Sequence, residues 1–449
     1  MTRPEGRSKA AASGESASSE AIPTTSPRRP SAGRPPPSAD LIAARAQELL
    51  LRNRRIGYAP WAGRFFDFTC PSLSGYPFQW FWDSCFHAIV LSHFDLGQAK
   101  SEMLTLTSLA REDGFIGHVI FWEADAFRSH GRRYAIARDR YTSTTIQPPV
   151  LAQAVEAIWQ ADHDQRFLQA ILPRLWRFHR WLLAYRDPDG DALISIIQPD
   201  ESGMDSSPRY DALFELPRLT RSGYRAAMRR LIGVYRRARA AGLDPLDLDA
   251  FSVEDVAVNA ILAEACLVLA RLSSAAGAGA EAAEFAAAHA RTSHALLAKC
   301  WDSERGLFFD LMGKGERPSR VATVASLLPL ILPDLPAVVA TRLVEEHLLN
   351  PQEFWSRYPV PSVALNEPSF KPGRGPLWRG PTWINTNWWL VRGLRAHGYD
   401  HVADQLVDRT AKLLGRSGFR EYYNPLTGAG YGARGFAWST LIVDMLRSR

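Results

Sequence analysis

A segment in the middle of the chain carries four carboxylates within a short stretch. Asp200, Glu201, Asp205 and Asp211 follow Gln198 among Gly, Ser and Pro residues, so the segment is predicted to be a loop rather than a helix face. Loop carboxylates suit general acid–base catalysis; a solvated acidic turn and a calcium loop are the alternatives. The spacing of an EF-hand is absent, and no glutamate closes a twelve-residue loop.

A second candidate carboxylate lies much later in the chain. Glu421 stands between Arg420 and the pair Tyr422 and Tyr423. Arg420 is expected to hold Glu421 ionised, as a general base requires, unless the two form a purely structural ion pair. Cleavage of a glycosidic bond needs two separated carboxylates of this kind. One protonates the leaving oxygen, and the other activates a water or attacks the sugar directly.

Helices must position these two segments. Apolar residues recur at three- and four-residue spacing after Asp40. Asp40 itself suits the N-cap of the first helix. Strand-like alternation is confined to short pieces such as Ala192–Ile197. The predicted helices cover residues 41–54, 83–96, 98–111, 149–161, 166–185, 222–240, 254–273, 279–300, 320–332, 336–348, 384–397, 400–415 and 436–448.

The loops between these helices hold the candidate chemistry. The segments rich in Trp, Gly, Pro and Asp are Gly75–Trp82, Gln198–Asp211, Arg374–Trp389 and Phe419–Gly435. About a dozen helices that close into two concentric rings, with these loops at one end, would form an all-α (α/α)₆ barrel. Periodicity predicts the helices but does not show that the ring closes.

Composition separates a tail from one catalytic domain. Residues 1–40 are rich in Ser, Ala, Pro and Gly and are predicted to be a disordered tail, whereas residues 41–449 form the predicted domain. The first forty residues hold six basic and four acidic residues, so a charge of +4 out of the net +6 is spread over the remaining 409, where clustered arginines fall at helical spacing. We therefore expect no nucleic-acid partner.

Other classes of protein are also disfavoured. The longest apolar run, Val321–Leu332, is interrupted by Pro329 and is shorter than the ~20 residues that a bilayer requires, so no membrane partner is expected. No secretory signal is visible, which predicts a cytoplasmic protein. Four scattered cysteines and histidines without metal-ligand spacing predict no metal site. The sequence does not define the oligomeric state.

The two carboxylate segments resemble known catalytic motifs. Glu201–Asp211 resembles the glutamate-serine-glycine-methionine-aspartate motif of glycoside hydrolase family 63 and is similar to that of trehalases. In those families the aspartate after Met or Trp is the general acid, which the resemblance assigns to Asp205. Arg420–Pro425 looks like the matching general-base loop, which implies that Glu421 is the base. The resemblance spans roughly residues 60–449 and implies an inverting α-glycosidase without a cofactor.

Further matches follow in the order of the family. Gln79–His87 resembles a tryptophan-aspartate motif whose carboxylate holds sugar hydroxyls, and Ile146–Pro149 and Leu377–Asn387 look like later loops of the family. The tryptophans in these segments either stack on a sugar or fill the barrel mouth. The implied substrate-binding residues are Asp83, Trp80, Trp82, Gln147, Arg209, Trp378, Arg379 and Trp383.

The length of the chain narrows the class of substrate that the resemblance implies. No room remains for the extra β-rich domain of large family 63 members, so the chain looks more like the compact mannosylglycerate and glucosylglycerate hydrolases. Ser206 stands where much of the family has Asn, and Gly435 where a polar residue is common; either would alter the substrate. Loop arginines would bind a carboxylate on the aglycone or else pair with the loop carboxylates. These arginines are Arg209, Arg374, Arg379, Arg420 and Arg434.

Three alternatives remain open. A trehalase-like enzyme or another α-glucosidase is the nearest, and a sugar epimerase or a sugar-binding module would be a non-hydrolytic helical barrel. Gly430–Gly435 matches the G-x-G-x-x-G string of dinucleotide sites, but no strand run precedes it and too few residues follow for a βαβ unit. The ordered pair Asp205 and Glu421 favours the hydrolase, because a binding module has no need of an acid and a base.

Overall fold

The computed structural model describes residues 38–123, 138–139, 141–215, 220–248, 250–375 and 377–448. The predicted tail lies outside them except for its last three residues, which begin the first helix. Ser38, rather than the predicted Asp40, caps this helix, because its Oγ accepts a hydrogen bond of 3.3 Å from the backbone N–H of Leu41.

Helices lie close to every stretch that the apolar spacing predicted. The α-helices are α1 (Ala39–Asn53), α2 (Phe81–Leu91), α3 (Leu96–Thr107), α5 (Leu151–Asp162), α6 (Gln165–Tyr185), α7 (Arg221–Ala240), α8 (Val256–Ala275), α9 (Gly279–Ala295), α10 (Ala337–Thr341), α11 (Ile384–Ala396), α12 (Asp400–Ser417) and α13 (Ile442–Arg447). The 3₁₀ and π segments are η1 (Pro199–Ser202), η2 (Pro208–Tyr210), η3 (Pro245–Asp247), η4 (Leu296–Cys300), η5 (Val324–Ile331), η6 (Arg342–Leu348) and η7 (Ala437–Leu441).

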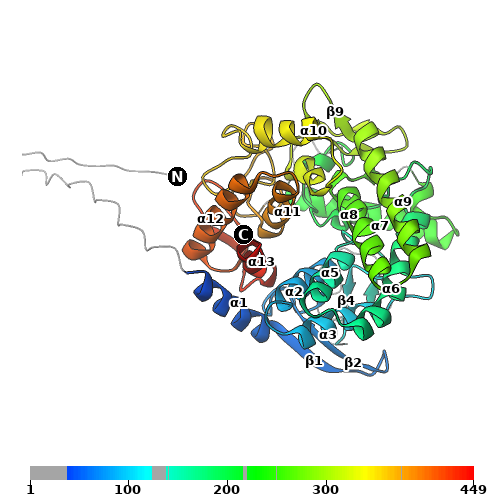
Figure 1. Ribbon diagram of the computed structural model, residues 1–449. Coiled ribbons are helices and arrows are strands. Elements are labelled where there is room, and N and C mark those ends of the chain that lie inside the picture. Colours follow the sequence, from blue (N-terminus) through cyan, green and yellow to red (C-terminus); the bar gives the residue numbers. More distant parts are fainter. Residues whose placement is uncertain are drawn as a thin grey trace, which may run out of the picture. The chain divides into compact units, whose positions relative to one another are not determined.

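The helices surround a common centre (Figure 1). An inner series runs α2, α5, α8, η5, α11 and η7; each member packs against the next, and η7 returns to α2. A second layer covers it, since α3 packs on α2, α6 on α5, α9 on α8 and α12 on α11. Every residue of α2 is buried, as expected of a helix enclosed on all sides. The described chain is therefore a helical barrel.

Helix α8 is long and apolar enough to cross a membrane by length and composition alone, although it lies outside the longest apolar run of the sequence. Of its most apolar window, 89% is buried inside the protein, where it belongs to the inner series. Its apolar surface is thus covered by neighbouring helices in the described structure.

Short strands accompany the helices, so a strictly all-α class is not confirmed. They are β1 (Arg54–Ala59), β2 (Arg64–Thr69), β3 (Gln79–Trp80), β4 (Val119–Ile120), β5 (Arg138–Asp139), β6 (Thr142–Ser143), β7 (Ser195–Ile196), β8 (Val253–Glu254), β9 (Trp301–Asp302), β10 (Leu307–Phe308), β11 (Leu311–Met312), β12 (Arg317–Pro318), β13 (Arg420–Tyr423) and β14 (Gly430–Arg434). They form small antiparallel sheets, two of four strands in the orders β12-β11-β8-β7 and β3-β4-β6-β5 and three of two strands. The segment Phe419–Gly435, predicted to be a loop, contains the hairpin β13–β14.

Candidate active site

A cavity of about 910 Å³, here called the catalytic cavity, lies where the segments preceding the inner helices converge. Trp80 comes directly before α2, Gln147 shortly before α5, and Trp383 directly before α11. The cavity brings together nearly all of the predicted site residues, although they are far apart in the sequence. Those that line it are Asp205, Glu421, Asp83, Trp80, Trp82, Gln147, Trp378, Arg379 and Trp383.

The loop that carries Asp205 is held by a buried ion pair. Glu201 is fully buried, accepts hydrogen bonds of 2.8 and 2.6 Å from the guanidinium of Arg186, and accepts two more from the backbone N–H groups of Ile146 and Ile197. Gly203 ends η1 in the left-handed region (φ 69°), where an added Cβ would lie 2.4 Å from the ring of Trp82. Only glycine can make this close turn beneath the tryptophan.

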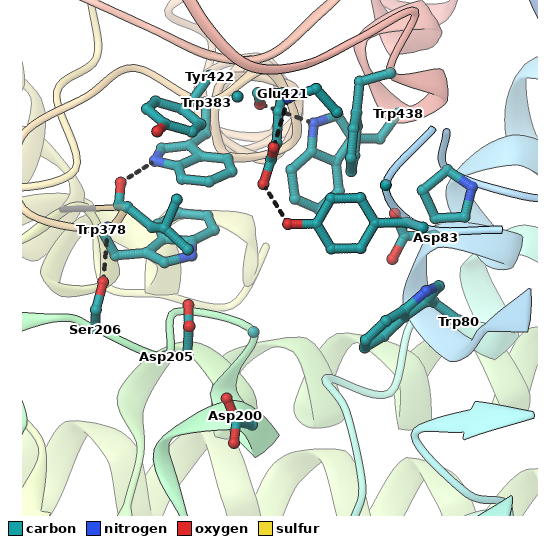
Figure 2. A pocket seen from close by; sticks show the side chains of 18 of the residues that line it. Trp80, Asp83, Asp200, Asp205, Ser206, Trp378, Trp383, Glu421, Tyr422 and Trp438 are labelled. Carbon is teal, nitrogen blue, oxygen red and sulfur yellow. Dashed lines mark hydrogen bonds between the residues drawn. The ribbon is translucent and has the colours of Figure 1, made fainter. Parts of the chain in front are cut away.

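The surroundings of Asp205 favour its protonated form. Burial raises the pKa of Asp205 to about 7, and the nearby charge of Glu421 acts in the same direction. Glu201 and Asp211, the neighbouring carboxylates of the same loop, are not among the charges that raise it. Both of those carboxylates are instead paired with arginines, Glu201 with Arg186 and Asp211 with Arg379. Figure 2 shows Asp205 and Glu421 on opposite sides of the cavity.

Glu421 is positioned by hydrogen bonds from both sides. Its Oε1 accepts from the hydroxyl of Tyr76 at 2.9 Å, and its Oε2 accepts from the backbone N–H of Ala433 at 2.8 Å. Burial raises the pKa of Glu421, whereas these hydrogen bonds lower it, and the charge of Arg420 is only the smallest of the lowering effects. The expectation that Arg420 keeps Glu421 ionised is therefore wrong in its cause, since Tyr76 and Ala433 act more strongly.

Asp83 lies in the first turn of α2 and faces the same cavity. Its side chain is 3% exposed, and among the described residues its Oδ1 has no hydrogen-bond partner. Burial, and after it the charge of Glu421, raises the pKa of Asp83 well above its usual range. A carboxyl with a free, desolvated oxygen at the wall of a cavity suits hydrogen bonding to sugar hydroxyls.

Aromatic rings form one wall of the cavity. Trp378 and Trp383 are stacked with centroids 3.9 Å apart and an interplanar angle of 4°, and Trp383 also stacks on Tyr422 at 4.9 Å. The Oγ of Ser206 accepts a 3.2 Å hydrogen bond from the backbone N–H of Trp378, which ties this wall to the loop of Asp205. Flat aromatic faces of this kind suit the apolar face of a sugar ring.

Arg209 does not line the cavity, and its predicted role in substrate binding is wrong. The side chain is 2% exposed and lies within 2.9 Å of carboxylate oxygens of both Asp255 and Asp310. The 3₁₀ turn η2 directs it toward the start of α8, where Asp255 is the N-cap residue. The buried guanidinium of Arg209 is stabilised by both carboxylates. Arg209 therefore supports the loop of Asp205 on the side that faces away from the cavity.

The other loop arginines separate into two groups. Arg374 and Arg379 line the catalytic cavity, and Arg379 pairs with Asp211. Arg420 and Arg434 line a different cavity, so these two loop arginines do not reach the aglycone carboxylate that the sequence suggested for them.

The cavity also contains residues that were absent from the predicted site, among them Tyr76, Asp200, Tyr224 and Trp438. Burial and the charge of Asp205 raise the pKa of Asp200 to about 8, and the hydroxyl of Tyr224 donates a 2.6 Å hydrogen bond to the backbone oxygen of Asp205. Asp200 and Tyr76 lie in segments that the sequence had singled out. Tyr224 and Trp438 lie within predicted helices, where nothing in the spacing marks them.

A cluster of carboxylates lies elsewhere in the described residues. Carboxylate oxygens of Asp189, Asp191, Glu254 and Glu316 lie within 4.8 Å of one another, and none of these residues lines the catalytic cavity. The ammonium of Lys299 contacts Asp191 and lies 2.8 Å from Glu316, so it already supplies a positive charge to this cluster.

A helical barrel with two carboxyls on opposite sides of an aromatic cavity, one of them with a pKa raised to about 7, suits the chemistry of a glycoside hydrolase. The comparisons with known proteins agree, because residues 76–439 match the model of the mannosylglycerate hydrolase MGH1-like glycoside hydrolase domain. The chain belongs to this family.

Relatives cover almost the whole chain. A mannosylglycerate hydrolase of Thermus thermophilus is 33% identical over 89% of this chain and 98% of its own length. A glucosylglycerate hydrolase of Mycolicibacterium hassiacum is 28% identical over 90% of this chain and 96% of its own length. A crystal structure of a family 63 mannosylglycerate hydrolase from Thermus thermophilus with Tris and D-glycerate superimposes with a TM-score of 0.79, at 33% identity, over 91% of this chain and 100% of that one.

Proposed function

We propose that this protein hydrolyses a small α-linked glycoside with a carboxylate on its aglycone, mannosylglycerate or glucosylglycerate, and inverts the anomeric configuration. The observation that carries the choice of substrate is a set of cationic side chains beside the acid and the base. Of the four, only Arg379 has an ion pair among the described residues. The set consists of Arg225, Lys371, Arg374 and Arg379.

The proposed reaction uses the two carboxyls in different protonation states. Asp205 donates its proton to the glycosidic oxygen as the bond to the anomeric carbon breaks. Glu421 removes a proton from a water that attacks the same carbon from the opposite face. Asp83 holds sugar hydroxyls, and the stack of Trp378 and Trp383 supports the ring. Inversion requires a gap of roughly 6.5–9.5 Å between the carboxyls of Asp205 and Glu421, and this separation remains a prediction.

The finer description of the fold belongs to the same proposal. We infer an (α/α)₆ barrel, residues 41–449, that acts as one catalytic domain. Its support is the inner series of six elements, each covered by an outer segment. The structure of a neutral trehalase from Saccharomyces cerevisiae, 14% identical with a TM-score of 0.58, is similar in fold alone.

A carboxylate-bearing aglycone explains the cations better than a neutral one does. A guanidinium binds a carboxylate through two parallel hydrogen bonds, and a partly desolvated site strengthens that contact. Arg379 is 3% exposed, its Nε has no partner among the described residues, and Asp211 engages Nη2. Arg379 thus keeps one donor for a ligand after it has paired with Asp211.

The test measures the hydrolysis rates of a panel of substrates and the anomer of the sugar that is released first. The wild-type protein should hydrolyse mannosylglycerate or glucosylglycerate faster than trehalose or a methyl α-glycoside, and proton NMR should detect the β-anomer first. Faster hydrolysis of trehalose would overturn the proposed substrate, and the α-anomer as first product would overturn inversion.

A variant pair separates substrate binding from loop support. Arg374→Gln should raise KM for the glycerate conjugate about tenfold and leave a methyl glycoside nearly unchanged, because it removes one charge-assisted hydrogen bond. Arg229→Gln, on an exposed part of α7 outside the cavity, is the matched control. An equal loss on charged and neutral glycosides would show that Arg374 only supports the loop.

A further inference from the structure

A second cavity lies behind the hairpin that carries Glu421. Its volume is about 660 Å³, and helix α1 forms one side while the end of α12 and the outer ends of β13 and β14 form the other. No residue of this cavity lines the catalytic cavity. The residues used below are Arg45, Glu48, Arg52, Arg420, Arg434 and Gly435.

Positive charge dominates this second cavity. Arg45, Arg52, Arg420 and Arg434 line it, against Glu48 as the one acidic residue among its lining side chains. None of the four arginines forms an ion pair within the part of the chain that the structure describes. Most arginine clusters on protein surfaces are interspersed with carboxylates, which is not the case here.

Two of these arginines stand directly opposite each other. Arg420 of β13 and Arg434 of β14 are cross-strand partners, a like-charge placement that destabilises a hairpin. Burial and the neighbouring charge of Arg434 lower the pKa of Arg420. The Nε of Arg420 is buried without a partner among the described residues, and its Nη2 reaches only the backbone oxygen of Gly432 at 3.3 Å.

Arg52 completes the arrangement from the side of α1. A Cβ added to Gly435 would lie 2.5 Å from its Nη2, so the guanidinium rests against the glycine at the end of β14. Gly435 has a φ of +60°, and the backbone oxygen of the same residue accepts a hydrogen bond from Asn53 at 3.1 Å. Because this position carries no side chain, the guanidinium of Arg52 can approach the end of the hairpin.

We propose that this arginine cavity binds the phosphate group of a small soluble molecule, with Arg52, Arg420 and Arg434 as its ligands. A phosphate carries nearly two negative charges at neutral pH and presents several acceptor oxygens, which several guanidinium groups match in charge and geometry. It would offset the repulsion between Arg420 and Arg434 and satisfy the orphaned Nε. A single carboxylate would neutralise less of the excess charge.

The position of this cavity couples it to the general base. Glu421 follows Arg420 directly, and Ala433, whose N–H holds the Oε2 of Glu421, directly precedes Arg434. A ligand that binds both arginines therefore fixes the two strands on either side of the base. Binding free energies of the phosphate and of the substrate are then linked, each favouring the other.

Direct binding to the full chain tests the site. With ionic strength held constant by sodium chloride, inorganic phosphate and glucose 6-phosphate should each give saturable heat in calorimetry and raise the Tm of the wild-type protein. The double variant Arg52→Gln/Arg434→Gln should lose the saturable heat and the Tm increase, whereas Arg229→Gln should retain both. Equal Tm increases with chloride alone, or binding that survives in the double variant, would overturn the site.

Two further measurements test the source of the phosphate and the coupling. Vesicles that contain phosphatidic acid should not co-sediment with the protein; co-sedimentation lost in the double variant would overturn a soluble ligand. Saturating phosphate should raise kcat/KM of the wild-type protein about fivefold, and not that of the double variant. An unchanged kcat/KM in the presence of saturable binding would overturn the coupling to Glu421.

Discussion

The two segments that carry the proposed acid and base are built in opposite ways. Glu201 and Arg209, which face away from the cavity, hold the loop of Asp205 through buried ion pairs. Within the described residues, the hydrogen bonds to the carboxyl of Asp205 come from nearby backbone. The hairpin of Glu421 instead directs a hydroxyl and a backbone N–H at the carboxylate itself. The first arrangement leaves burial to retain a proton, whereas the second stabilises a negative charge.

This difference shows how one cavity holds an acid and a base at the same pH. Burial raises the pKa of both carboxyls, and the charge of Glu421 raises the pKa of Asp205 further. Hydrogen bonds to the charged form decide which carboxyl ionises first. Tyr76 therefore distinguishes the base from the acid more than any formal charge does.

The largest expected effect comes from removing either carboxyl. Asp205→Asn abolishes proton donation and Glu421→Gln abolishes proton removal from water, so each should lower kcat by about 10³-fold or more on the best substrate. Circular dichroism and Tm should stay close to those of the wild-type protein. Glu112→Gln, an exposed glutamate outside the cavity, is the control. Turnover within tenfold of wild type in either variant would refute the assigned role.

The buried ion pairs of Arg209 should contribute most to the free energy of unfolding. Arg209→Ala leaves Asp255 and Asp310 buried without a cation, which should lower the free energy of unfolding by about 3–5 kcal/mol. Arg379→Ala should cost clearly less, since Asp211 is more exposed than either of those carboxylates. Urea unfolding of the two variants measures the difference. Equal losses would contradict the division between a bracing and a cavity-lining arginine.

Removing the hydroxyl that holds the base should have a smaller, pH-dependent effect. Tyr76→Phe takes away a hydrogen bond to the ionised form, so the pKa of Glu421 should rise further. The base must be ionised, and the acidic limb of kcat/KM should therefore move to higher pH, with a loss of about tenfold below it. Tyr185→Phe, an exposed residue, should leave the profile unchanged. An unmoved acidic limb would show that Tyr76 does not control the ionisation of Glu421.

The smallest expected change concerns the alkaline limb. Asp205 must keep its proton, and its pKa of about 7 predicts that kcat/KM falls as the pH rises through that value. The charge of Asp205 in turn helps to raise the pKa of Asp200 to about 8, so Asp200 is still largely protonated where Asp205 titrates. Asp200→Asn, which replaces one neutral side chain by another, should therefore leave the alkaline limb close to its wild-type position. A clear shift of that limb to lower pH would show that Asp200 is already charged when Asp205 ionises.

The sequence predicted the helices well because apolar spacing is a local property. It missed the hairpin of Glu421, since the glycine-rich run before Gly435 has no alternating pattern to mark a strand. The sequence also could not predict in which direction the side chain of Arg209 points. Its partners Asp255 and Asp310 come from segments that only the closed barrel brings beside the loop.

Most of the residues that motif resemblance singled out line the catalytic cavity, although they are far apart in the sequence. Motif resemblance identifies the positions of the catalytic carboxyls, but not the groups that set their pKa values. Tyr76 and Ala433 reach Glu421 from separate parts of the chain, and their effect depends on hydrogen-bond distances. The pKa of each carboxyl is a property of the assembled cavity.

Closure of the inner series has a consequence for how the protein folds. The first inner helix, α2, packs against the last inner element, η7, so the ring joins segments near the two ends of the described chain. Contacts of such large sequence separation form late and slowly, because much chain entropy must be lost before they are made. Asp205 is synthesised near the middle of the chain and Glu421 only shortly before η7. A growing chain therefore gains its acid long before its base, and catalytic competence should appear abruptly, when the final segment closes the ring.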